Sequence, residues 1–249
     1  MLWWRFLIAG ALVFPFALRD FSKKNHSFKE FFNLFFFGGI VSGLCSLLYF
    51  QAAQDLGTGM AMIIFFTFPI FVVLFSWIFD KYSIQPVIYL SILLIIIGLV
   101  LLVNDGCHHI SFKGGSAAIA SGFFYAVYIF ISKRSKTSPL YLTWAICWGS
   151  AFNLLVLGMI DQGNFWFPHL SPPLKYTFFT AFFATLLPTV LLLEAMKRIS
   201  ATKASLLSVF EPISTTLIGV VLLGECVSFT QFIGAIVVLT GACLTYYEK

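Results

Sequence analysis

Residues 87–103 read VIYLSILLIIIGLVLLV, an apolar run without a charged side chain. A helix rises about 1.5 Å per residue, so roughly 20 such residues cross the hydrocarbon core of a bilayer, which is about 30 Å thick. Similar runs extend from Ile63 to Phe79 and from Ile213 to Leu223. They are too long and too uniform for the alternating, roughly ten-residue strands of a membrane β-barrel. The sequence therefore predicts transmembrane α-helices.

The composition of the whole chain also indicates a membrane protein. Of its 249 residues, 60% are apolar and only 10% are charged, which is too little charge to cover a soluble domain of this size. We predict an all-α integral membrane protein with about nine transmembrane helices. Their expected ranges are 2–18, 31–50, 58–79, 86–103, 115–132, 140–160, 177–196, 202–222 and 230–247.

The basic residues predict how these helices are oriented. Most of the 15 Lys and Arg residues fall in alternate connections, on one side of the membrane, whereas Arg5, Lys113 and Lys175 fall on the other. The basic side is expected to be cytoplasmic, which places the C-terminus inside the cell and predicts a multi-pass protein of the inner (cytoplasmic) membrane. The net charge of +5 does not indicate nucleic acid binding. The basic residues lie in short clusters between apolar runs and do not form a basic face with interleaved aromatic residues.

An internal repeat relates positions that lie 143 residues apart, the separation between Pro69 and Pro212. The other matching positions are Gly57 with Ser200, Ala61 with Ala204, and Gly98 with Gly241. The copies are expected to point in opposite directions, because Gln54-Asp55 on the outer side correspond to Lys197-Arg198 on the inner side. We predict a first repeat at 1–104 with four helices and a second at 105–249 with five.

The first copy lacks one helix in this scheme. The partner of the helix at 115–132 would precede residue 1. We expect that the start is assigned too late or that the chain is a fragment; the alternative is nine spans with an exported N-terminus.

Several stretches carry a family resemblance. Residues 195–207 read AMKRISATKASLL and lead to Glu211-Pro212, followed by Gly224-Glu225, by QFIGA at 231–235 and by Gly241. Together they resemble the second-repeat signature of the drug/metabolite transporter superfamily, EamA type. Residues 4–10, WRFLIAG, resemble the start of the second helix of this family. One departure is Lys81-Tyr82, which replaces the Gly-Glu pair in the first repeat.

The resemblance implies a secondary transporter of a small metabolite, with an amino-acid-like, nucleoside-like or drug-like solute, working by alternating access. It also implies a central cavity lined by the helices at 31–50, 58–79, 115–132, 177–196 and 202–222, with no cofactor. Proton coupling and a homodimer stay open. The alternatives are a flippase for a lipid-linked intermediate and a degenerate paralogue that does not transport.

A membrane enzyme is disfavoured by the residues themselves. Intramembrane catalysis needs paired acids, a histidine cluster or an activated serine at depth. Here every histidine lies outside the predicted spans, and Glu211 stands alone near the middle of its span. We therefore predict no catalytic residue and no metal site.

Glu211 is the first candidate for a substrate or proton site. Inserting a charged side chain at the centre of a bilayer costs about 3 kcal/mol of free energy on insertion scales. A charged residue at this depth therefore indicates a functional or structural role. The alternative role is a structural hydrogen bond beside Pro212.

Two prolines are predicted as kinks or gates. Pro69 and Pro212 lack an N–H, so they should leave the carbonyls of Phe65 and Ser208 without their usual helical partner. Interrupted helices at matching positions of two repeats are typical of a transporter site, whereas a plain packing kink is the alternative. For Pro188 we expect only a kink.

The remaining candidates are polar or aromatic side chains. Tyr49 and Gln51 are placed at the outer end of the cavity, and Thr67 at its midplane. Tyr125 and Trp148, with Tyr128 and Trp144, are expected to form an aromatic wall, although lipid-facing packing is the alternative. Glu194 is expected to pair with Lys197 or Arg198. Cys45, Cys147 and Cys243 are expected as small core residues, and a Cys107–Cys226 disulfide is left open.

Overall fold

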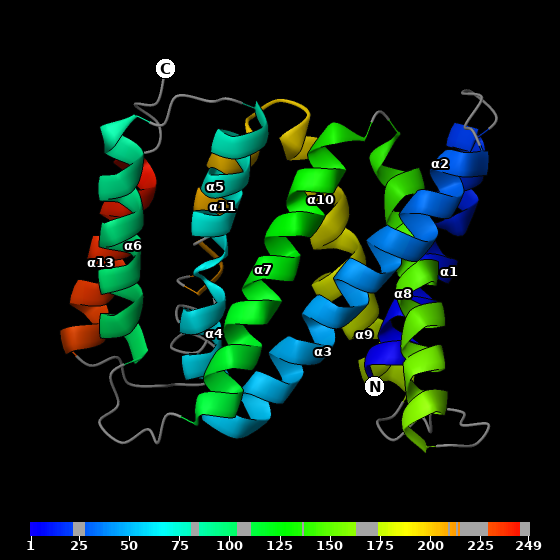
Figure 1. The fold of residues 1–249 in the computed structure, drawn as a ribbon, viewed down its shortest axis with the longest axis horizontal. Coiled ribbons are helices and arrows are strands. Elements are labelled where there is room, and N and C mark those ends of the chain that lie inside the picture. The colour runs from blue at the N-terminus through cyan, green and yellow to red at the C-terminus, as the bar shows by residue number, and fades with distance from the viewer. Residues whose placement is uncertain are drawn as a thin grey trace. The chain divides into compact units, whose positions relative to one another are not determined.

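The computed structural model describes residues 1–21, 28–80, 85–103, 111–135, 137–162, 174–208, 210–212, 214 and 229–244. Every regular element in these ranges is a helix (Figure 1). The chain forms two compact units, which we call the first and the second unit. The first unit contains Met1–Leu47 and Ile131–Arg198, and the second contains Leu48–Phe130 and Ile199–Lys249.

The first unit is built from long helices, two of which contain a π-helical segment. Its elements are α1 (Leu2–Phe21), α2 (Phe28–Asn33), the π-helix η1 (Leu34–Gly38), α3 (Gly39–Leu56), α8 (Pro139–Gln162), α9 (Leu174–Ala181), the π-helix η2 (Phe182–Leu186) and α10 (Leu187–Met196). The end of α3 continues into the second unit.

The second unit has shorter elements and one long helix that runs on into the first. Its elements are α4 (Thr58–Phe65), α5 (Phe68–Asp80), α6 (Pro86–Val103), α7 (Phe112–Arg134), α11 (Ala201–Leu207) and α13 (Phe229–Leu244).

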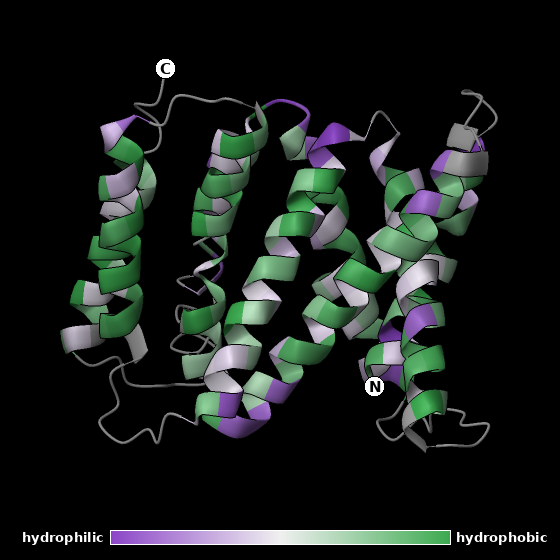
Figure 2. Ribbon diagram, viewed as in Figure 1, coloured by the Kyte–Doolittle hydropathy of each residue, from purple (hydrophilic) through white to green (hydrophobic). Residues whose placement is uncertain are grey.

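These helices confirm the prediction of an all-α integral membrane protein. Within the described residues, five helices are long and apolar enough to cross a membrane, and α5, α6 and α13 are shorter apolar helices. Most residues along these helices are hydrophobic (Figure 2). Trp77, Leu93 and Phe183 are each more than half exposed, at 57%, 55% and 57%, as side chains that face lipid should be. Of the predicted span at 202–222, the structure describes only the first part.

One predicted span is interrupted near its proline. The segment at 58–79 is two helices, α4 and α5, which are separated at Phe66-Thr67. The physical reason is Pro69, which cannot donate a hydrogen bond to the preceding turn.

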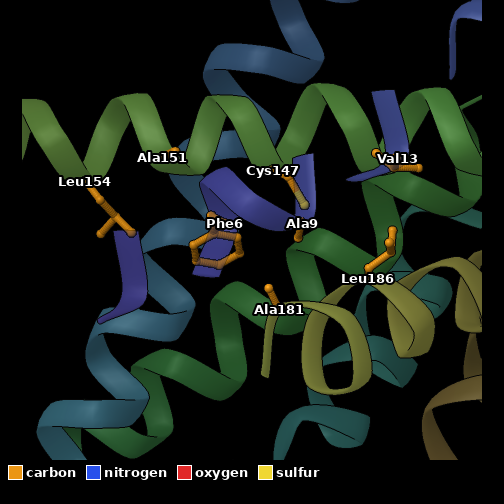
Figure 3. Close-up of a cluster of buried hydrophobic side chains, with 8 residues drawn as sticks. All are labelled: Phe6, Ala9, Val13, Cys147, Ala151, Leu154, Ala181 and Leu186. Atoms are coloured by element: carbon orange, nitrogen blue, oxygen red, sulfur yellow. The ribbon is translucent and has the colours of Figure 1, made fainter. Parts of the chain in front are cut away.

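The core of the first unit lies where α1 packs along α8. Phe14 lies 5.7 Å from Trp144 and Gly10 lies against Trp148, so the two helices run antiparallel. Figure 3 shows eight buried side chains gathered there: Phe6, Ala9, Val13, Cys147, Ala151, Leu154, Ala181 and Leu186. Several of them are small, which lets membrane helices approach closely and gain van der Waals contact.

The second unit has a corresponding antiparallel pair, α6 with α13 (Figure 1). A Cβ atom at Gly98 would lie 2.7 Å from the backbone nitrogen of Val238, and one at Gly241 would lie 3.0 Å from the carbonyl oxygen of Ser91. Both helices therefore use a glycine for close approach. Gly98 and Gly241 are also partners in the predicted repeat.

Candidate functional site

The break between α4 and α5 lies in the second unit, within the predicted transmembrane segment at 58–79. Gly57 caps the start of α4 with a φ of 82°, a conformation that favours glycine. At the other end of α4, the N–H of Thr67 donates to the carbonyl oxygen of Ile64 at 3.1 Å, and the Thr67 hydroxyl donates to the same oxygen at 2.8 Å. The N–H of Ile70 then donates to the Thr67 carbonyl at 3.0 Å. These bonds satisfy much of the interrupted backbone without water.

The carbonyl of Phe65, which Pro69 deprives of its usual partner, lies against α7. A Cβ atom at Gly122 would come within 2.9 Å of this oxygen. Gly122 therefore gives α7 room beside the break, and any larger residue would press on the interrupted backbone.

Aromatic rings surround the same break. Tyr49 of α3 lies 5.4 Å from Phe65, and Tyr125 of α7 lies 5.3 Å from Phe65 and 4.8 Å from Phe68. Tyr125 also stacks on Tyr128 at 5.9 Å with an interplanar angle of 19°. The structure thus brings the predicted candidates Tyr49, Thr67 and Tyr125 to one place.

Glu211 follows α11 in the same unit. Its N–H donates to the carbonyl oxygen of Ser208 at 3.0 Å, and the Ser208 hydroxyl donates to the Ala204 carbonyl at 3.0 Å. The Ser208 carbonyl that Pro212 was expected to free therefore has a partner. The side chain of Glu211 keeps exposed surface and lies close enough to Tyr49 to interact with it electrostatically.

The profile of the EamA-like transporter family matches residues 1–104 and 112–247. The chain belongs to the EamA-like transporter family. The expected family is therefore confirmed, and with it a multi-pass membrane protein that transports a small solute.

Similar proteins agree with this family. An uncharacterized transporter of Archaeoglobus fulgidus is 27% identical over 95% of this chain and 82% of its own length. The threonine/homoserine exporter RhtA of Escherichia coli strain K12 is 28% identical over 98% of this chain and 79% of its own length. A solved crystal structure of another protein superposes with a TM-score of 0.79 over 98% of this chain and 85% of that one; at 21% identity, this shows a shared fold.

The other predicted site residues of this EamA-like protein have different surroundings. Gln51 is exposed on α3. Trp148 belongs to the first unit, where its indole ring lies against Gly10 and is 37% exposed. Trp144 packs against Phe14, Phe31 and Tyr141 in that unit. The aromatic wall of Tyr125 with Trp148 stays a prediction.

The three prolines that were predicted as kinks or gates differ in their burial. Pro69 and Pro212 are buried, whereas Pro188 is exposed and lies in the first turn of α10, just after the π-helix η2. The irregular backbone before Pro188 is thus a π segment. π-helical segments are rare in proteins, but those that occur are often found at functional sites.

Sequence reasoning missed a cation packed into the first unit, Arg5, which is partly buried. It lies in the first turn of α1, with its Nε atom fully enclosed and its guanidinium 5.3 Å from the ring of Phe6. It shares the interior of the first unit with Cys45 and Cys147, which interact with it electrostatically. Its place inside an apolar run was the available signal, because a charged side chain within a span marks a functional candidate.

The remaining predictions concern cysteines and ions. Cys45 and Cys147 are buried, but Cys243 is exposed near the end of α13, so its expected place in the core is wrong. Glu194 pairs with Lys197 at 2.9 Å, as expected. Within the described ranges no group of three metal-ligating side chains occurs. Cys107, Cys226 and His108-His109 lie outside these ranges.

Proposed function

We propose that this EamA-like protein is a secondary transporter that moves a small amino-acid-like solute across the cytoplasmic membrane by alternating access. The observation that carries the proposal is the helix break at Phe66-Thr67, within a predicted span, where the rings of Tyr49 and Tyr125 lie against Phe65. Discontinuous helices of this kind form the substrate sites of many secondary transporters, because their interrupted ends present polar backbone at membrane depth.

The chemistry around the break suits a solute with an ammonium group. The faces of tyrosine and phenylalanine rings attract cations, and the attraction grows when water is excluded. Glu211 is the acidic side chain that interacts electrostatically with Tyr49, and we assign it as the partner of the ammonium group. The exporter RhtA, which acts on threonine and homoserine by its name, supports an amino acid as the solute class.

Repeat-related features support alternating access. Gly57 and Ser200 are repeat partners, and each caps the start of a helix: Ala61 donates to the Gly57 carbonyl at 3.1 Å and Ala204 donates to the Ser200 carbonyl at 3.0 Å. The antiparallel pairs α1 with α8 and α6 with α13 likewise join segments of the two predicted repeats. Inverted repeats give a transporter two equivalent arrangements, in which one copy rocks against the other.

We propose no enzymatic role for this chain. The family and the relatives are transporters. Among the described residues at the break, the Thr67 hydroxyl bonds to its own backbone.

Transport by the full chain in proteoliposomes tests the proposal. The panel of labelled solutes starts with threonine and homoserine and includes an acidic, a basic and a nucleoside solute. We expect uptake of a neutral amino acid, and we expect Glu211→Gln to lower its rate about tenfold or more, a loss of ~1.4 kcal/mol, because the ammonium loses its charged partner.

The matched control is Glu194→Gln, which removes an exposed carboxylate of α10 that pairs with Lys197. Its rate should stay within about twofold, because exposed ion pairs contribute little. Unchanged rate and pH dependence in Glu211→Gln would remove Glu211 from the mechanism. Transport of the nucleoside alone would reject the amino acid as the solute.

A further inference from the structure

A polar cavity lies in the first unit where α7 ends, α8 begins and α10 ends. Its volume is about 220 Å³, and its polar wall consists of Ser132, Lys133, Ser135, Thr137 and Lys197. Since one water molecule occupies about 30 Å³ of the liquid, the cavity has room for roughly seven waters, or for a phosphate group with its attached glycerol. These residues have no part in the transport site described above.

The wall of this cavity contains a buried hydroxyl without a hydrogen-bond partner. Ser132 is 8% exposed, and its Oγ atom makes no hydrogen bond within the described residues. Leaving a buried donor unsatisfied costs about 1–3 kcal/mol, so a ligand with acceptor oxygens would remove this penalty. Two further hydroxyls stand close by, because Ser135 Oγ and Thr137 Oγ1 form a hydrogen bond of 2.5 Å.

Two lysines give the cavity a positive charge. Lys133 of α7 donates from Nζ to the carbonyl oxygen of Met196, at the C-terminal end of α10. An ammonium group carries three N–H donors, the kind of donor that phosphate oxygens accept. Lys197 pairs with Glu194, but both side chains are about half exposed, at 50% and 49%. An exposed ion pair of this kind contributes little to stability, so Lys197 can bind a phosphate group in place of Glu194.

We propose that this cavity binds a phosphate group, and that its source is the headgroup of an anionic phospholipid. Serine and threonine hydroxyls and lysine ammonium groups are the donors that phosphate oxygens accept. Leu142 and Leu193 form an apolar part of the cavity wall. The acyl chains of a lipid whose headgroup is bound in the cavity can extend along them into the bilayer. Arg134 and Arg198 adjoin it in sequence, and basic residues at helix ends attract the anionic lipids of the cytoplasmic leaflet.

The bound phosphate would join two helix ends. Its oxygens would bridge Ser132 and Lys133 on α7 to Lys197 after α10, where at present the Lys133 bond to Met196 makes the connection. The lipid is therefore expected to stabilise this end of the first unit, independently of which solute the protein transports.

Thermal unfolding of the purified full chain in a neutral detergent tests the site. One arm adds phosphatidylglycerol or phosphatidylcholine, and the other adds sodium phosphate or sodium chloride at equal ionic strength. We expect saturating phosphatidylglycerol to raise Tm by roughly 5 °C and the other additions to raise it far less.

Variants locate the effect. Lys133→Gln should remove most of the phosphatidylglycerol shift. Ser132→Ala should reduce it without lowering the Tm measured in lipid-free detergent, because the deleted hydroxyl makes no hydrogen bond to the described residues. Lys113→Gln, at the opposite end of α7, is the matched control and should keep the full shift.

Each outcome decides the proposal. A loss of the shift in Ser132→Ala with retention in Lys113→Gln supports the site, even if Lys133→Gln fails to fold. An equal shift in all variants, or no shift in the unmodified chain, overturns it. A shift with sodium phosphate and none with phosphatidylglycerol keeps the phosphate site and overturns the lipid as its source.

Discussion

Each unit contains a place where a backbone carbonyl of one helix lies against a glycine of another, and the two places differ in how much room is left. In the first unit, a Cβ atom at Gly149 of α8 would lie 1.9 Å from the carbonyl oxygen of Phe35 in the π-helix η1. In the second unit, a Cβ atom at Gly122 of α7 would lie 2.9 Å from the carbonyl oxygen of Phe65 at the helix break. Neither crossing accepts a Cβ atom without a shift, but the overlap at the first crossing is much larger than at the second.

The difference suggests different roles for the two crossings. The η1–α8 crossing is closed on both sides, because a Cβ atom at Gly39 would also lie 2.4 Å from the carbonyl carbon of Gly149. Backbone packed against backbone cannot yield by a side-chain rotation. We interpret this crossing as a fixed scaffold, and the break beside Gly122 as the place where the backbone can bend.

Gly149→Ala should have the largest effect on stability. The added methyl group would overlap the Phe35 carbonyl, so the helices must separate, at a cost of about 3 kcal/mol or more. The measurement is Tm of the purified chain, together with the yield of folded protein.

The control for this substitution is Gly115→Ala on α7, where an added Cβ would meet no atom within 4 Å. Alanine favours a helix over glycine by about 1 kcal/mol, so this variant should be neutral or slightly more stable. Equal Tm values for the two variants would contradict a fixed crossing at Gly149.

The helical spans themselves could be predicted from the sequence, but their irregular parts could not. The apolar run after Pro86 gave the bounds of α6 correctly, since length and apolar character define a span. Pro69 signalled an irregularity, yet a missing N–H does not determine whether a helix bends or breaks. The π-helix η1 reads LFFFG, which has no proline and looks like an ordinary apolar helix.

The candidate site was predicted in part for a related reason. Tyr49, Thr67 and Tyr125 were singled out as polar or aromatic residues in spans, and the structure brings them to the break. The distribution of basic residues assigned Arg5 to an outer connection. Such a count predicts the side of the membrane on which a residue lies, but it does not predict the direction of a long side chain. Contacts between distant helices decide that direction.

Gly122→Ala should have an intermediate effect on stability, and it tests whether the two crossings have different roles. The overlap with the Phe65 carbonyl is smaller than at Gly149, and the interrupted helix can shift, so we expect a loss of about 1–2 kcal/mol. If the break must bend during transport, the rate in proteoliposomes should fall more than the loss of stability explains. A transport rate like that of Gly115→Ala would contradict the interpretation of the break as the mobile place.

Ser150→Ala should have the smallest effect, and it measures how the scaffold crossing is held. The Ser150 hydroxyl donates to the Gly39 carbonyl at 3.2 Å, directly beside the closed contact. Hydrogen bonds between membrane helices contribute about 0.6 kcal/mol on average, so Tm should fall by only a few degrees. The matched control is Ser116→Ala, whose hydroxyl bonds to the Lys113 carbonyl of its own helix and should leave Tm unchanged. A loss in Ser150→Ala as large as that in Gly149→Ala would mean that this hydrogen bond, and not the close backbone packing, holds the first unit together.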